Sequence, residues 1–125
     1  MTSKGRSYAG NSDDRAECRC STTIRELNDD LRRTMIGGQV IITNGIEALG
    51  LMKVTSILHA VRQFDEFSCA DDPFDEHDFG ALTWQSHHVF WKIDYYDKQL
   101  EFGSPDPADP DVTARVITIM LAAEY

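Results

Sequence analysis

The feature that most constrains this chain is an alternation of apolar and polar residues over positions 79–102, interrupted by two turn-like dipeptides. A period of two residues is typical of β-strands that bury one face. We expect two-residue turns at 86–87 and 97–98, and hence two successive hairpins. The pairs opposed in this register are Trp84 with Val89, Leu82 with Trp91, Gly80 with Ile93, Tyr95 with Leu100, and Ile93 with Phe102.

This register determines the face of the sheet on which each side chain lies, since a slip of one residue would move every side chain to the opposite face. The face predicted to form the core under the helices carries Trp84, Trp91, Tyr95 and Phe102. The opposite face carries a candidate polar site formed by His77, Lys92, Asp94, Tyr96 and Glu101. Asp94 is expected opposite Glu101, and directly opposed like charges are unfavourable in a sheet.

Two interpretations of this candidate polar face stay open. In the first, Lys92 neutralises the carboxylates and His77 bonds to a neighbour, so the face is structural. In the second, His77, Asp94 and Glu101 form a binding face or a weak metal site, because an imidazole and two carboxylates suit a hard or borderline divalent ion. We assign no catalytic residue and expect no cofactor.

Helical periodicity and turn residues predict the other elements. We expect a helix that ends at the glycine pair 37–38 and begins with a Thr23–Glu26 capping box, or with Ser21 or Thr22 as its cap. The other expected elements are a short strand at 39–43, an ambiguous second strand at 46–49, a helix at 51–65 and a last helix at 109–125. The last helix would begin at Asp109–Pro110 and bury Val112, Val116, Ile119, Met120 and Ala123.

These elements predict an α+β fold: a small, mainly antiparallel sheet of three to five strands with about three helices packed on one face. Residues 1–20 have almost no large apolar side chains and are expected to form a disordered N-terminal tail. Residues 21–125 are expected to form a single domain. The three cysteines do not make a disulfide framework.

Acidic residues dominate the predicted domain. Residues 21–125 contain eighteen acidic and eight basic side chains, and the net charge of the whole chain is −9. The segment 65–78 contains seven carboxylates and no Lys or Arg. It lacks the D-x-D-x-D-G spacing of a calcium loop, so we favour a solvated acidic loop over an ion site.

This charge constrains the partners. A strongly acidic surface repels nucleic acid and anionic membranes, so neither is expected to bind directly. It suits a basic protein partner, or it serves only to keep the protein soluble. No apolar segment follows Lys4 and Arg6, so we expect no signal peptide and a cytoplasmic location.

Four segments occur in an order that is specific to one family: EHDFGAL, FWKIDYYD, FGSPDPADP and RVITIMLAAEY. Over roughly residues 22–125 the chain resembles the bacterial family called domain of unknown function 3768. The resemblance implies a bacterial, cytoplasmic protein of the kind found in alphaproteobacteria, sometimes on plasmids. It implies no activity, cofactor or catalytic residue. From the acidic surface we expect a non-enzymatic protein-binding or accessory module, and the plasmid context favours a role related to mobile elements or anti-defence. The alternative is a small metal-binding protein or enzyme that uses His77, Asp94 and Glu101.

Overall fold

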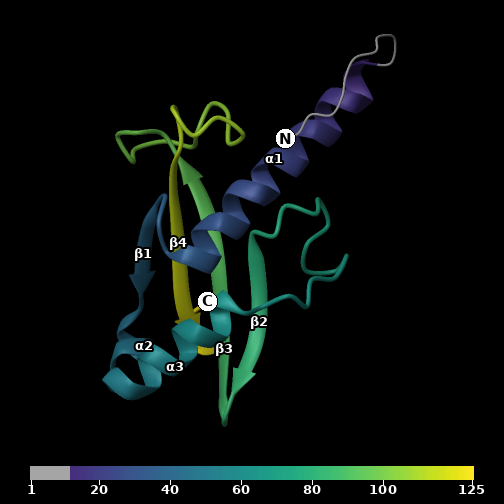
Figure 1. Cartoon of the computed structure of the whole chain (residues 1–125). Helices are drawn as coiled ribbons and strands as arrows, with labels where there is room; N and C mark the ends of the chain where they lie inside the picture. Colours follow the sequence, from purple (N-terminus) through teal and green to yellow (C-terminus); the bar gives the residue numbers. More distant parts are fainter. Residues whose placement is uncertain (1–11) are drawn as a thin grey trace.

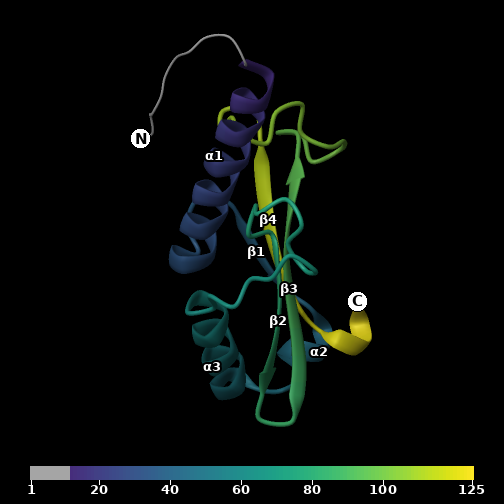
Figure 2. The same cartoon turned by 90° about the vertical axis from the view of Figure 1, so that its right-hand side faces the viewer.

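The computed structural model describes residues 12–125, with side chains described from Thr22 onward. Its elements are α1 (Ser12–Thr34), β1 (Gln39–Ile42), α2 (Asn44–Glu47), α3 (Leu51–Arg62), β2 (Phe79–Trp84), β3 (His87–Tyr96), β4 (Ala114–Leu121) and the short 3₁₀ helix η1 (Ala122–Glu124). The strands form one sheet, with α1 and α3 on one face and η1 on the other (Figures 1 and 2). The predicted α+β fold is confirmed. No helix within the described residues is long and apolar enough to cross a membrane.

The sheet has the strand order β1-β4-β3-β2. β2 pairs with β3 and β3 pairs with β4 in antiparallel fashion, whereas β1 runs parallel to β4. The sheet is therefore mixed, and β4 occupies a central position between β3 and β1 (Figure 1).

The prediction of a helix over 109–125 is wrong, because Ala114–Leu121 is the central strand β4. The strand is buried on both faces, so its apolar residues do not alternate with polar ones. The periodicity of a continuous apolar run does not distinguish a buried strand from a buried helix. The β-branched residues of 116–119 favour the strand, since their stiff side chains fit a pleated surface.

The predicted second hairpin is also wrong. β4 pairs with β3 in its place, and the only bridge from the following loop joins Tyr96 to Gly103. Phe102, expected in the core, is 71% exposed in this loop. The partner of β3 comes from a distant part of the chain, which local register counting does not detect.

The first hairpin forms with a register two residues away from the predicted one. Trp84 pairs with His87 and Gly80 pairs with Trp91. The turn is Gln85–Ser86, where Gln85 adopts the positive φ (54°) that such two-residue turns require at their first position. A shift of two residues keeps each side chain on its predicted face, so Trp91 still lies in the core.

Two further differences concern the first half of the chain. α1 begins at Ser12, so residues 12–20 of the predicted tail are helical, while residues 1–11 lie outside the described part. The ambiguous strand at 46–49 is wrong, because Asn44–Glu47 forms the single-turn helix α2, which buries Ile46. The helix predicted at 51–65 is confirmed as α3, which ends three residues earlier, at Arg62.

The core lies between the sheet and the helices α1 and α3. Its buried apolar residues are Leu31, Ile46, Val54, Ile57, Val61, Val89, Trp91, Ile93, Ile117 and Ile119. Gly80 makes room for the largest of them: a Cβ atom at this position would lie 2.4 Å from the indole Nε1 of Trp91.

Candidate functional site

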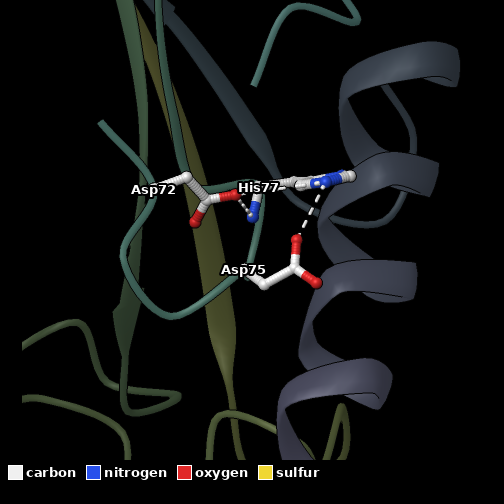
Figure 3. Close-up of side chains that lie close together, drawn as sticks. All are labelled: Asp72, Asp75 and His77. Atoms are coloured by element: carbon white, nitrogen blue, oxygen red, sulfur yellow. Dashed lines mark hydrogen bonds and ion pairs between the residues drawn. The ribbon is translucent and has the colours of Figure 1, made fainter. Parts of the chain in front are cut away.

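Two aspartates and a histidine converge where the 65–78 loop folds back against α1. Asp72, Asp75 and His77 each offer one ligand atom, and these atoms lie within 4.8 Å of one another. Figure 3 shows both carboxylates directed toward His77. Of the described residues, this is the group whose donor atoms come closest to a metal-binding arrangement.

His77 is held in one orientation by its surroundings. Its Nδ1 lies 2.9 Å from Oδ1 of Asp29 on α1, and its ring stacks on Phe67 at a centroid distance of 3.7 Å. A carboxylate only accepts hydrogen bonds, so Nδ1 is the donor in this contact. Its Nε2 then faces Asp75, whose Oδ1 lies 3.5 Å away.

The two loop carboxylates already have partners. The buried Asp72 accepts hydrogen bonds from the backbone N–H groups of Glu76 (2.9 Å) and His77 (3.0 Å), which shapes the loop. Asp75 forms an ion pair with Arg25 of α1, with 2.6 Å between Nη1 and Oδ2. Both carboxylates therefore have partners within the chain, and the Asp75–Arg25 ion pair fastens the acidic loop to α1.

A buried polar network adjoins this cluster. Asn28 of α1 donates from Nδ2 to the carbonyl of Glu76 (3.0 Å) and to the hydroxyl of Tyr95 (2.8 Å), and its Oδ1 accepts from Nε of Arg115 (2.9 Å). The Tyr95 hydroxyl donates to Oε1 of Glu76 (3.0 Å). Arg115 also donates to the carbonyl of Pro107. The network thus connects the 65–78 loop to the loop that follows β3.

Burial affects the ionisation of this region. It raises the pKa of Tyr95 and lowers the pKa of Arg115 relative to their ordinary values. Burial also raises the pKa of Asp78, and the neighbouring carboxylates of Glu76 and Asp72 add to that shift. The phenol therefore stays neutral at physiological pH, and protonation of Asp78 is favoured by the negative potential around the loop.

The segments 65–78 and 97–111, here called the two acidic loops, concentrate the charge of the molecule. They contain twelve of the twenty-one carboxylates of the chain and one of its twelve Lys and Arg residues, Lys98. The Asn28 network contacts both loops, through the carbonyl of Glu76 in the first and, by way of Arg115, the carbonyl of Pro107 in the second.

The residues of the predicted polar face are dispersed. Lys92 Nζ lies 3.1 Å from Asp94 Oδ2, so these two form the expected ion pair. Asp94 is paired with Val116 of β4, and the predicted opposition of Asp94 and Glu101 is wrong because β4 occupies that place. Glu101 is exposed in the loop after β3, and Tyr96 is half-buried at the end of β3.

His77 lies with Asp29 and the loop aspartates rather than with Asp94. It adopts a positive φ of 56°, which places the residue outside the alternation of the strand that follows it. Sequence reasoning did not identify Asp29, Asp72 or Asp75 as neighbours of His77. The one available signal was the D-x-x-D-x-H spacing inside the acidic loop.

A family model described as "Protein of unknown function (DUF3768)" matches residues 42–124, from the end of β1 into η1. The chain belongs to the DUF3768 family. A search of curated proteins and a search of solved structures found no match. The DUF3768 match includes both acidic loops, whereas α1, which supplies Asn28 and Asp29, lies before it.

Proposed function

We propose that this DUF3768 protein is a non-enzymatic accessory module that binds a basic segment of another protein through its two acidic loops. The observation that supports the proposal is the concentration of twelve carboxylates on two loops that one buried network holds together. Clustered charge of one sign steers a partner of the opposite sign toward that surface.

Several of these carboxylates are available to a partner. Asp65, Glu66 and Asp71 are exposed, and none of them forms an ion pair with a described Lys or Arg side chain. In the second loop Glu101 is exposed in the same way. Such carboxylates can pair with Lys or Arg of a partner without breaking an ion pair inside the chain.

The internal contacts of the two aspartates near His77 favour a binding role over a catalytic one. The Asp75 carboxylate is paired with Arg25, and the Asp72 carboxylate accepts two backbone N–H groups, so both serve the loop structure. A dense array of carboxylates also imitates the charge of nucleic acid. We therefore propose a cytoplasmic partner with a basic surface, as in a protein that binds nucleic acid, and an accessory role of the kind carried by mobile elements.

The first test measures binding of a fluorescent Lys/Arg-rich peptide by anisotropy at low and high salt. A loop variant combines Asp65→Asn, Glu66→Gln and Asp71→Asn, which removes three charges and keeps side-chain size. We expect the native protein to bind at low salt, the affinity to fall as salt rises, and the loop variant to bind several-fold more weakly.

The matched control removes three exposed carboxylates outside the acidic loops: Glu26→Gln, Asp30→Asn and Glu47→Gln. Its net charge equals that of the loop variant, so a difference between the two reports the location of the charge. Equal losses would show that only net charge matters, and the proposed loop surface would be wrong. A pull-down from bacterial lysate with native protein and loop variant would then identify the natural partner.

A further inference from the structure

β1 is an edge strand whose outer edge is open. It pairs with β4 on one side, and no other strand among residues 12–125 pairs with it (Figure 1). Natural edge strands are protected from pairing by charged side chains, proline or bulges. Residues 34–46, which contain β1, include no Asp, Glu, Lys, Arg, His or Pro.

Apolar side chains are exposed at this open edge. Val40 is 39% exposed and Ile41 is 44% exposed, and Ile36 just before the strand is 76% exposed. The opposite edge strand, β2, has no comparably exposed large apolar residue. β1 therefore combines unpaired backbone groups with apolar side chains that are not covered within the described part of the chain.

We infer that β1 pairs with the β1 strand of a second copy of this protein. The net charge of the protein and the absence of charge from residues 34–46 are the reasons for choosing a second copy as the partner. Each copy carries a net charge of −9, so two copies repel each other except where both surfaces are uncharged. The 34–46 segment is such a surface, and it offers no carboxylate for a basic partner to recognise.

The direction of the backbone groups restricts the register of this pairing. The N–H of Thr43 donates to the carbonyl of Ile119 in β4. Backbone groups of successive residues in a strand point to alternate edges, so those of Ile41 point to β4 and those of Val40 and Ile42 point outward. We centre the antiparallel pair on Ile41, which is more exposed than Val40, so that Val40 of each copy exchanges both hydrogen bonds with Ile42 of the other.

A two-fold axis then passes beside Ile41, which lies opposite its own counterpart. Val40 and Ile42 have their side chains on the helix-covered face in both copies, since their β4 partners Ile117 and Ile119 belong to the core. The two sheets join into one continuous sheet with the helices of both copies on the same side. Such an isologous contact closes at two copies and forms no filament.

The strand is short, so the dimer is expected to be weak. Four residues with one flanking isoleucine bury less than the interface of about 1,600 Å² that is standard for stable complexes. The inference therefore predicts a monomer–dimer equilibrium that depends on protein concentration.

Sedimentation velocity of the full chain over a concentration series up to the millimolar range tests this directly. We expect the native protein to shift toward dimer as concentration rises. Ile41→Lys places two ammonium groups opposite each other at the axis and is expected to keep the protein monomeric throughout. The control Ala81→Lys adds the same charge on the other edge strand at an exposed position, and it should dimerise like the native protein.

Disulfide trapping gives a second measurement that does not depend on a disrupting variant. In a background with Cys18, Cys20 and Cys69 replaced by serine, Ile41→Cys brings two thiols together at the axis. The Cα atoms of such a non-hydrogen-bonded pair lie about 4.5 Å apart, within disulfide range. Gln39→Cys is the control, because the same register keeps its two copies too far apart.

We expect a covalent dimer on oxidation of the Ile41→Cys protein and none for Gln39→Cys. A native protein that stays monomeric at millimolar concentration would overturn the inference. Dimers that survive Ile41→Lys, or that cross-link equally at position 39, would also overturn it, because they would place the contact elsewhere. These results are independent of peptide binding by the acidic loops, so either proposal can fail alone.

Discussion

Arg32 of α1 holds the end of α3, and its replacement gives the most informative test of the fold. The side chain is fully buried. From Nη1 it donates to the carbonyls of Val61 (3.1 Å), Arg62 (3.2 Å) and Phe64 (2.8 Å), and from Nη2 to Oδ1 of Asp29 (3.1 Å). The carbonyls at a helix C-terminus have no partner inside the helix, so the guanidinium caps α3 from a neighbouring helix.

Arg32→Met removes these hydrogen bonds and keeps most of the apolar length of the side chain. Each buried carbonyl that loses its donor costs roughly 1–3 kcal/mol. Burying the guanidinium is itself unfavourable, as the lowering of the pKa of Arg32 by burial indicates. Removing this charge therefore offsets part of the cost of the lost hydrogen bonds. The balance gives a loss of about 3–5 kcal/mol, as for other broken buried charge contacts.

Urea unfolding followed by tryptophan fluorescence measures this loss, and thermal unfolding should show a decrease in Tm of about 10–20 °C. Arg33→Met is the control, since the Arg33 side chain is 59% exposed and its nearest contact to Asp29 is 4.0 Å. The control should change the free energy of unfolding by less than about 0.5 kcal/mol. If both variants lose the same small amount, the buried guanidinium does not cap α3, and apolar packing alone holds the two helices together.

Two further predictions use glycine and glutamate positions. Gly80→Ala should destabilise the protein by about 1–3 kcal/mol in urea unfolding, because its Cβ would collide with the buried Trp91 ring, whereas Gly103→Ala has its nearest atom at 3.9 Å and should be neutral. Glu124 accepts hydrogen bonds from the hydroxyl of Thr43 (2.5 Å) and from two backbone N–H groups, and the Thr43 bond contributes most to lowering the pKa of Glu124. A lowered folded-state pKa stabilises the protein above the unfolded-state pKa, and this stabilisation is lost as pH falls through the folded-state value. Glu124→Gln should therefore be less stable than native at neutral pH and equally stable in acid, and a difference that does not vary with pH would contradict this.

The parts of the fold that follow from short stretches of sequence were predictable. The apolar residues of α3 recur at helical spacing and are buried as expected, including Val54, Ile57 and Val61. The β2–β3 hairpin keeps its predicted faces although its register differs by two residues, because side-chain direction repeats with that period.

The parts that depend on distant partners were not predictable. The segment 114–121 has a composition compatible with a buried helix or a buried strand, and its pairing with β1 and β3 decides the outcome. The candidate site depends on a similar long-range contact: His77 reaches Asp29 only because the acidic loop returns to α1. The positive φ of His77 is a backbone property that residue type does not indicate.

The central position of β4 has a consequence for how the chain folds. The β2–β3 hairpin joins neighbouring segments and can form early, because closing a short loop costs little entropy. β1 comes early in the sequence, and β4, its one strand partner within residues 12–125, comes after every other strand of that part. The sheet is therefore completed by a late, non-local step that inserts β4 between β1 and β3. A chain with such a step is expected to fold more slowly than a helical protein of similar size, and until β4 is in place its β1 strand has both edges unpaired.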